Sequence, residues 1–291
     1  MNYENQKKIA GIDEAGRGPL FGPVVASAVV FKQEIKIDGL MDSKKISHSK
    51  RKEVFNQIIR ENIDYGIGII HEDVIDRINI LNATKRAMSL AVKNLKNKPS
   101  KLLIDGNQLI ESDIKQEAII KGDQRISQIS AASIIAKVTR DEIVKSYSKV
   151  YPMFDLDSHK GYGTKKHIKS LKKYGPTSIH RHTFKPVCDI VSNSFKEYES
   201  YNITKKAIKL IKEGFYIDAF QIKENVSFIR CKVKNLDIYI LSLRREEVDS
   251  LLPSIISKIK EKDSVNKARL DVIYSDDNSL NPKVMHSCEI L

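Results

Sequence analysis

The sequence has no tryptophan, only three cysteines and no long uninterrupted apolar run. Cys188, Cys231 and Cys288 are odd in number and widely spaced, which excludes a disulfide framework and a CxxC metal-binding pattern. No apolar run approaches the length that spans a bilayer, and the opening MNYENQKKIA lacks the apolar centre of a signal peptide. We therefore expect a cytoplasmic protein that does not bind membranes.

Acidic residues are also in short supply. There are 37 Asp and Glu against 50 Lys and Arg, which gives a formal net charge of +13. Residues 1–200 hold 34 of the basic and 24 of the acidic side chains, so the excess lies in the first two thirds of the chain. A basic balance suits a polyanionic partner such as nucleic acid, although a solvated lysine-rich surface explains the charge equally well.

Short apolar segments alternate with helical patterns in the first two thirds of the chain. Segments rich in Val and Ile or bounded by glycine predict strands at residues 9–13, 24–31, 65–71, 102–105 and 118–120. Apolar residues at helical spacing predict helices over residues 73–95 and 126–151. This order of elements predicts an α/β fold in which helices pack on a mixed sheet.

A polar stretch after Pro186 predicts the end of a first domain, which we place at residues 1–200 and in which we include basic C-terminal helices. Residues 201–291 are expected to form a small accessory α+β domain of unknown role. Its expected helices are residues 207–213 and 251–260, and its expected strands are residues 226–233, 236–243 and 269–274.

The stretch GIDEAGRGPLFGP, residues 11–23, places Asp13 and Glu14 at the end of the first strand, before a glycine-rich turn. On a regular strand these side chains would point to opposite faces. We expect the strand to stop near Glu14 and turn through Gly16 and Gly18, so that both carboxylates converge. The alternative interpretation is a charged strand end followed by an ordinary glycine turn.

Two more acids follow apolar segments and stand beside glycine: Asp105 in KLLIDGN and Asp123 in AIIKGDQRIS. Singly, each would be a turn residue or a helix cap. Together, three strand ends carrying acids predict one site, because ligands of α/β sheets gather at strand ends. Oxygen ligands without His or Cys favour Mg²⁺ or Mn²⁺ over zinc. The chemistry predicted is phosphoryl transfer with two metal ions.

Five motifs, in order and spread across residues 9–186, resemble bacterial ribonuclease HII. They are GIDEAGRGPLFGPVVASAVV, DSKKIS, LLIDGN, KGDQRISQISAASIIAKVTRD and HKGYGTKKHIKSLKKYGPTSIHRHTF. The resemblance implies a ribonuclease H-like fold with a mixed five-stranded sheet. It also implies that Asp13, Glu14, Asp105 and Asp123 bind Mg²⁺ or Mn²⁺. The implied substrates are RNA–DNA hybrids and single ribonucleotides in duplex DNA, cut to leave 5′-phosphate and 3′-hydroxyl ends.

The same resemblance assigns Gly16, Arg17 and Gly18 to recognition of the 2′-hydroxyl at an RNA–DNA junction. Bare glycine backbone can approach a sugar closely, and a 2′-hydroxyl both donates and accepts hydrogen bonds. Tyr162 of HKGYGT matches the tyrosine of the family that senses the junction. Its ring would pack on a deoxyribose; otherwise it is a loop tyrosine at the surface. Lys44 and Lys45 of DSKKIS are candidates for phosphate contacts, as any exposed lysine pair would be.

Residues 158–188 hold eight Lys or Arg and four of the seven histidines, without a single acid. We interpret this segment as a track along the phosphate backbone rather than as a solvated basic helix. The four histidines, His159, His167, His180 and His182, fit no zinc-binding spacing. The acids imply attack by water, with the 2′-hydroxyl used for recognition.

Two other functions compete with this interpretation. Ribonuclease HIII carries Gly-Lys-Gly in place of Gly16-Arg17-Gly18 and an N-terminal domain, for which eight residues before the first strand leave no room. A nucleic-acid-binding protein on a degenerate nuclease fold is opposed by the presence of all four acids. Residues 201–291 distantly resemble a small nuclease-like family but lack its Glu-x-Lys, which predicts an inactive docking or packing module. A monomer is expected.

Overall fold

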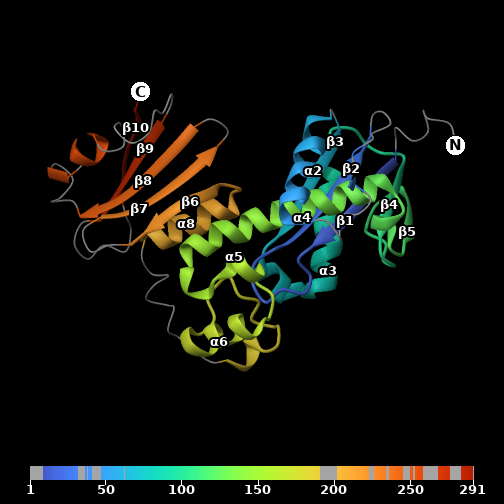
Figure 1. The fold of residues 1–291 in the computed structure, drawn as a ribbon, viewed down its shortest axis with the longest axis horizontal. Helices are drawn as coiled ribbons and strands as arrows, with labels where there is room; N and C mark the ends of the chain where they lie inside the picture. The colour runs from blue at the N-terminus through green and yellow to red at the C-terminus, as the bar shows by residue number, and fades with distance from the viewer. Residues whose placement is uncertain are drawn as a thin grey trace. The chain divides into compact units, whose positions relative to one another are not determined.

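The computed structural model describes residues 9–31, 37, 39–40, 47–61, 63–190, 202–222, 226–233, 236–244, 250–251, 253–257, 268–275 and 283–290. The chain forms two compact units, and its elements are labelled in Figure 1. Unit 1 comprises Met1–Glu142, Lys160–Thr164 and Ser178–Ile190. Unit 2 comprises Ile143–His159, Lys165–Thr177 and Val191–Leu291. Among the described residues, no helix is both long and apolar enough to cross a bilayer.

Unit 1 contains a mixed five-stranded sheet with the strand order β3-β2-β1-β4-β5. The strands are β1 (Ile9–Ala15), β2 (Val24–Val30), β3 (Asp64–Ile70), β4 (Lys101–Asp105) and β5 (Lys115–Ile119). β1 to β3 form an antiparallel meander, while β4 runs parallel to β1 and β5 runs parallel to β4. The predicted α/β fold with a mixed five-stranded sheet is therefore confirmed.

Helices cover both faces of this sheet. α3 (Glu72–Lys93) packs on one face, where Ile12 and Ile104 join Ala87 in one apolar core. α2 (His48–Arg60) and α4 (Ser127–Val150) supply the core of the other face, where Ile58 and Ile135 belong to the same cluster. Because strand side chains alternate, even-numbered residues of β1 face α3 and odd-numbered residues face α4.

α4 approaches β1 so closely that only glycine fits at position 11. A Cβ atom on Gly11 would lie 2.3 Å from the backbone carbon of Gln128 and 2.3 Å from the backbone nitrogen of Ile129. Non-bonded carbon atoms normally stay about 3.5 Å or more apart. Gly11 therefore sets how near the start of α4 lies to the strand that carries Asp13.

The predicted helix over residues 73–95 corresponds to α3, but α3 is broken at Asn79. This residue has φ 64° and ψ 166°, which is not helical. Its side-chain oxygen accepts a hydrogen bond from the backbone N–H of Asn82 at 3.1 Å, so Asn79 caps the second part of the helix. Asparagine tolerates positive φ better than most residues, and the apolar spacing gave no sign of the break.

Unit 2 holds short helices and a second sheet. The named helical elements are η3 (Pro152–Phe154), α5 (Leu156–His159), α6 (Lys165–Tyr174) and α8 (Asn202–Lys212). The described residues 250–251 and 253–257 are also helical, where a helix was expected over residues 251–260. The strands are β6 (Tyr216–Gln221), β7 (Val226–Val233), β8 (Leu236–Arg244), β9 (Ala268–Ser275) and β10 (Lys283–Ile290), in the order β10-β9-β8-β7-β6. Only β8 and β9 pair in parallel. This α+β arrangement agrees with the appendage expected after residue 200, although β6 and β10 had no clear strand signal in the sequence.

The end of α4 lies against the second sheet within unit 2. The backbone N–H of Ile217 in β6 donates to the hydroxyl of Ser146 in α4 at 3.0 Å. Ile143–His159 thus groups with the C-terminal region rather than with unit 1. The two remaining short elements, η2 (Gly122–Gln124) and η4 (Val187–Asp189), belong to unit 1.

Candidate active site

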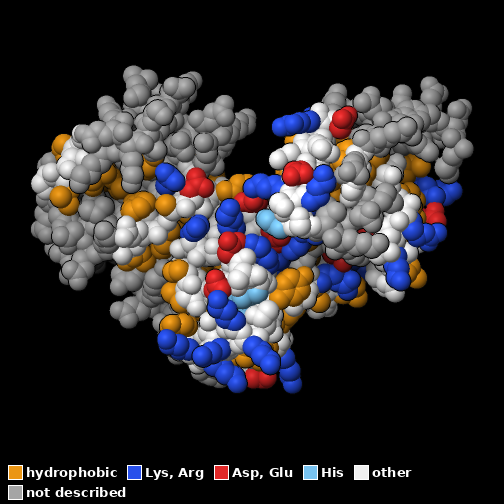
Figure 2. Space-filling model, in the orientation of Figure 1, with side chains coloured by type: hydrophobic (Ala, Val, Ile, Leu, Met, Phe, Trp, Pro, Cys, Tyr) orange, Lys and Arg blue, Asp and Glu red, His pale blue; other side chains and the backbone are white. Residues whose placement is uncertain are grey.

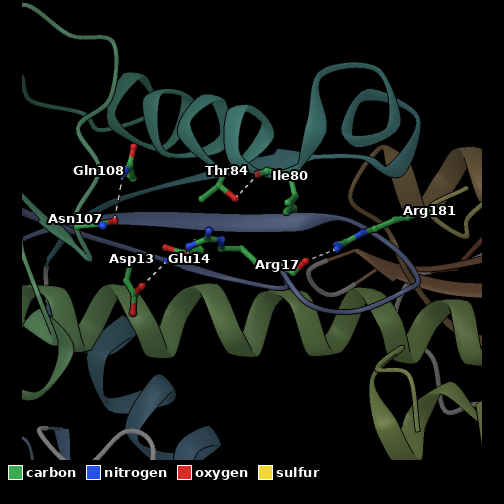
Figure 3. A network of polar contacts seen from close by, with 8 residues as sticks. All are labelled: Asp13, Glu14, Arg17, Ile80, Thr84, Asn107, Gln108 and Arg181. Atoms are coloured by element: carbon green, nitrogen blue, oxygen red, sulfur yellow. Dashed lines mark hydrogen bonds and ion pairs between the residues drawn. The ribbon is translucent and has the colours of Figure 1, made fainter. Parts of the chain in front are cut away.

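Asp13 and Asp105 lie at the ends of two neighbouring parallel strands. Ile12 of β1 pairs with Ile104 of β4, so the residues that follow them are Asp13 and Asp105. Both isoleucines pack in the core beneath α3, which places the two acids on the opposite face, toward α4. Figure 3 shows the Asp13 side chain pointing toward α4, where Ser133 forms a hydrogen bond with it. The two acids therefore share one face of the sheet.

Glu14 leaves β1 on the other face. The pairing of β1 with β2 continues through Glu14 to Ala15, one residue further than the expected end of the strand near Glu14. Regular alternation places the Glu14 position on the other face, but its carboxylate remains close enough to interact with the Asp13 side chain. Its Oε1 also lies 3.4 Å from Nη1 of Arg17. The Glu14 carboxylate still interacts electrostatically with that of Asp105.

Asp123 lies in the turn after β5 and is held against Asp105 through the backbone. The N–H groups of Gly122 and Asp123 donate to Oδ1 of Asp105 at 2.7 and 3.3 Å. Lys121 enters the turn with φ 55°, in the left-handed region. A Cβ atom on Gly122 would lie 2.6 Å from Cδ1 of Ile129 in α4, so the turn has little space to spare. The side chain of Asp123 is fully buried.

Burial and mutual repulsion oppose the ionisation of these carboxyl groups. Burial, followed by the charges of Glu14 and Asp105, raises the pKa of Asp13 well above its ordinary value. Burial also raises the pKa of Glu14, although the neighbouring guanidinium of Arg17 acts in the opposite direction. A site that keeps carboxylates against this cost gains from a cationic partner.

The donor set fits a divalent cation by its chemistry. Carboxylate oxygens are the ligands of hard cations such as Mg²⁺ and Mn²⁺. Burial, and then the charges of Glu14 and Asp105, raise the pKa of Asp13, and a bound cation would stabilise its ionised form. Within the described part of the chain, however, no three Asp, Glu, His or Cys side chains already surround a common point.

The turn after β1 exposes a short glycine-flanked arginine. Gly16 has φ 98°, a conformation that favours glycine, and a Cβ atom there would lie 2.1 Å from Nε of Arg140. Arg17 and Gly18 are exposed, and the guanidinium of Arg17 lies beside Glu14 (Figure 3). The backbone of Arg17 and Gly18, close to the acids, is thus accessible, whereas Gly16 is buried.

Tyr162 lies opposite this turn. A Cβ atom on Gly18 would lie 3.5 Å from Cε1 of Tyr162, which is an ordinary van der Waals distance. The Tyr162 side chain is 44 % exposed. The N–H of Leu20 donates to the carbonyl of Gly161 at 2.8 Å and joins the two loops. The glycine turn and Tyr162 therefore present one continuous surface.

Two buried arginines that the sequence did not single out, Arg140 and Arg181, hold these loops from behind. Both side chains are fully buried and donate to backbone carbonyls of residues 16–23. Figure 3 shows the contact from Arg181 to the carbonyl of Arg17. In the sequence, the only sign of this role was that each arginine stands within an otherwise apolar or buried segment.

The basic segment forms an exposed lysine surface on α6. His167 and Leu171 are the buried side chains of this helix, while Lys169 and Lys172 are exposed. Blue side chains gather over α6 at the bottom of the view in Figure 2. The four histidines of the segment form no metal cluster among the described residues.

Comparison with known sequences decides the family. The sequence model of the family described as "Ribonuclease HII" matches residues 10–187. The chain belongs to the ribonuclease HII family. A ribonuclease HII from Clostridioides difficile is 56 % identical over 176 residues, which cover 60 % of this chain and 69 % of the relative. A ribonuclease HII from Bacillus subtilis is 51 % identical over 179 residues, 62 % of this chain and 70 % of the relative.

A solved structure gives the same picture. The ribonuclease H2 from Pyrococcus horikoshii superposes with a TM-score of 0.53 at 28 % identity and covers 62 % of this chain and 95 % of its own. As a member of the ribonuclease HII family, the chain is a divalent-metal-dependent ribonuclease of the hydrolase class. RNA–DNA hybrids are its substrate class.

Two sequence predictions fall wholly or partly on residues that the structure does not describe, and the family match decides a third. Lys44 and Lys45 are not among the described residues. The segment from which a Glu-x-Lys is absent, residues 238–247, is described only as far as residue 244, so an inactive C-terminal module stays a prediction. Ribonuclease HIII is no longer a competitor, because the family match is to ribonuclease HII.

Proposed function

We propose that the protein incises duplex DNA on the 5′ side of a single embedded ribonucleotide, as well as cutting the RNA strand of hybrids. The observation that carries this proposal is the contact surface between Gly18 and Tyr162, directly after the strand that bears Asp13. The exposed backbone of Arg17 and Gly18 can hydrogen-bond a 2′-hydroxyl, and the neighbouring tyrosine ring can pack on a deoxyribose. Gly16, which is buried, shapes the turn that presents them. A ribose followed by a deoxyribose is the feature that distinguishes this substrate.

We propose further that Asp13, Glu14, Asp105 and Asp123 hold two ions of Mg²⁺ or Mn²⁺. When bound, such ions activate a water and stabilise the leaving oxygen of a phosphodiester, which leaves 5′-phosphate and 3′-hydroxyl ends. The shared face of Asp13 and Asp105 supports this role, as does the backbone contact that brings Asp123 beside Asp105. Arg17, whose Nη1 lies 3.4 Å from Oε1 of Glu14, would be able to contact a phosphate of the substrate.

The remaining assignments belong to the same proposal. Lys44, Lys45 and the lysines of α6 contact phosphates. The catalytic domain ends near residue 200, which the family match to residues 10–187 supports, and residues 201–291 are accessory. The protein acts as a monomer in the cytoplasm, with which the exposed free thiol of Cys188 is compatible.

The direct test is incubation of the purified protein and Mn²⁺ with duplex DNA that carries one ribonucleotide. A nick on the 5′ side of that ribonucleotide is expected, with an all-DNA duplex as the uncut control. Tight binding without a nick would instead favour a nucleic-acid-binding protein on a nuclease fold. Cleavage of a long hybrid but not of the single-ribonucleotide duplex would overturn the junction-specific part alone.

Tyr162→Ala is expected to lower kcat/KM on the single-ribonucleotide duplex by about tenfold to 100-fold, because ring stacking contributes roughly 1–3 kcal/mol. On a long hybrid the loss should be much smaller, since no deoxyribose follows the cleaved ribose. Tyr162→Phe keeps the ring and serves as the matched control, with near-normal rates on both substrates. Equal losses of Tyr162→Ala on both substrates would contradict a role in reading the junction.

The lysines of α6 should govern the salt dependence of binding. The pair Lys169→Gln and Lys172→Gln is expected to weaken binding to any duplex and to reduce the slope of log K against log salt by about two, one for each phosphate contact. The control pair, Lys93→Gln and Lys98→Gln, removes two exposed lysines from a different part of the chain. An unchanged slope in the α6 variant would show a solvated surface.

A further inference from the structure

Arg140, in the middle of α4, is fully buried and donates to three backbone carbonyls. Its Nε donates to Pro23, its Nη2 to Phe21 and its Nη1 to Lys160, each at 3.1 Å. Pro23 and Phe21 belong to the loop between β1 and β2, whereas Lys160 precedes the loop of Tyr162. One side chain therefore ties the glycine-rich loop to the tyrosine loop.

Arg181, from the segment after α6, approaches the same loop. Its Nε donates to the carbonyl of Gly22 at 3.0 Å, its Nη1 to that of Arg17 at 2.8 Å and its Nη2 to that of Gly16 at 2.6 Å. The backbone N–H of Arg181 also donates to the carbonyl of Leu20 at 2.8 Å. Every one of these hydrogen bonds from Arg140 and Arg181 ends on a backbone carbonyl oxygen of residues 16–23 or of Lys160.

Burying two positively charged guanidinium groups near each other costs free energy, which argues that the positions they fix are needed. Burial lowers the pKa of Arg140 to about 10, and burial with the charge of Arg140 lowers that of Arg181 to about 9. Both guanidinium groups therefore stay charged at neutral pH, close to one another in the interior. Well-packed apolar side chains commonly replace buried charges without loss of stability. A planar fork of fixed donors, in contrast, fixes the positions of the carbonyls that it contacts.

Asp76 of α3 supports the Arg181 end of this arrangement. Its two carboxylate oxygens accept the backbone N–H groups of His182 at 2.8 Å and Thr183 at 3.0 Å, and the hydroxyl of Thr183 at 2.6 Å. The charges of Glu72 and Asp76 favour the cationic form of Arg181. Asp76 thus fixes the backbone from which Arg181 reaches the loop.

We propose that Arg140 and Arg181 are positioning residues that set the distance between the glycine turn and Tyr162, and so set the selectivity for a single ribonucleotide. This inference rests on the proposed function, in which those two loops read the two sides of an RNA–DNA junction. On a long hybrid every sugar of the cleaved strand is a ribose, so Tyr162 has no deoxyribose to contact in that strand. The relative placement of the loops then matters less, so the arginines act mainly on the junction substrate.

Arg181→Lys and Arg140→Lys test the proposal, because lysine keeps the charge but loses the fork of donors. Each variant should lower kcat/KM on the single-ribonucleotide duplex by about 100-fold, the effect of misplacing a contact group by roughly 1 Å. On a long hybrid the loss should stay below about tenfold. Asp76→Asn leaves both arginines in place. It should change the ratio of kcat/KM on the single-ribonucleotide duplex to kcat/KM on the long hybrid by a smaller factor. This variant keeps the proposal testable if an arginine variant fails to fold.

Asp64→Asn is the matched control for a general loss of stability. Asp64 is buried in β3 and accepts hydrogen bonds from the backbone N–H groups of Lys96 and Asn97, on the loop between α3 and β4. Asp64→Asn should lower the Tm without changing the ratio of kcat/KM on the two substrates. If the arginine variants lose activity equally on both substrates, as this control would, the selectivity role is wrong.

Amide hydrogen exchange provides a readout that does not depend on activity. In Arg181→Lys, exchange should accelerate at residues 16–23 and 160–164 and stay unchanged in β3. Unchanged exchange at both loops would overturn the positioning role even if cleavage fell. If the wild type does not nick a single-ribonucleotide duplex, the proposed function fails, whereas the exchange experiment still decides whether the arginines hold the loops.

Discussion

Asp13→Asn is expected to lower the rate of hybrid cleavage by about 10³-fold or more and to raise the Tm of the metal-free protein. Losing one metal-holding carboxylate removes several kcal/mol of transition-state stabilisation, and ~4 kcal/mol corresponds to about 10³-fold. The gain in stability follows because Asp13 is only 5 % exposed and burial raises its pKa well above the ordinary value. The amide keeps the shape and removes the buried charge.

The raised pKa of Asp13 also determines how the stability gain of Asp13→Asn should vary with pH. The folded protein holds the Asp13 proton more tightly than the unfolded chain, because its pKa is raised above the ordinary 3.8. The metal-free wild type therefore loses stability as the pH rises from that value through the raised pKa. The Tm advantage of Asp13→Asn should be small near about pH 4 and larger near about pH 8. Mn²⁺ at about 100 times its Kd should stabilise the wild type by ~2.7 kcal/mol and the variant by much less.

Thermal unfolding in EDTA and in Mn²⁺, with cleavage assays on the same preparations, checks both parts. Asp64→Asn is the control for the chemical change itself. Its carboxylate accepts two backbone N–H groups and the side-chain amide of Asn97, so this variant should lose stability instead of gaining it. An Asp13→Asn variant that cleaves at the wild-type rate would contradict the assignment of Asp13.

The sheet of unit 1 could be predicted where its strands are apolar. β2, all of whose residues are buried, and β1 match the predicted segments closely at their starts. β5 runs over Lys115–Ile119, whereas only residues 118–120 gave an apolar signal. An edge strand with one exposed face needs few apolar residues, so its pattern is weak. α2 was missed for the same reason, because Val54 and Ile58 are its only buried residues.

The candidate site was predictable in composition but not in detail. Strand ends followed by glycine pointed to Asp13 and Asp105, since parallel neighbouring strands end at the same edge of a sheet. The face taken by Glu14 depends on one further residue pair between β1 and β2, which no local pattern encodes. Arg140 and Arg181 bind backbone carbonyls, and because every residue has a carbonyl, such contacts leave no signature in the sequence.

Gly11→Ala is expected to destabilise unit 1 by about 3 kcal/mol or more, equivalent to a fall in Tm of roughly 6–12 °C. The added methyl group would overlap the backbone of Gln128 and Ile129, 2.3 Å away, and backbone atoms of a helix cannot yield as a flexible side chain does. α4 would have to move off β1, and Ser133 would move with it, away from Asp13. We therefore expect the residual cleavage at low temperature to fall as well.

Gly18→Ala is the control for stability. A Cβ atom there meets only Cε1 of Tyr162, at 3.5 Å, so its Tm should change by much less than that of Gly11→Ala. Thermal unfolding of both variants, followed by cleavage assays well below each Tm, separates loss of fold from loss of site geometry. A Gly11→Ala variant with wild-type Tm would mean that α4 does not lie against β1 as closely as the backbone positions require, and with it the shared face of Asp13 and Asp105 would be in question.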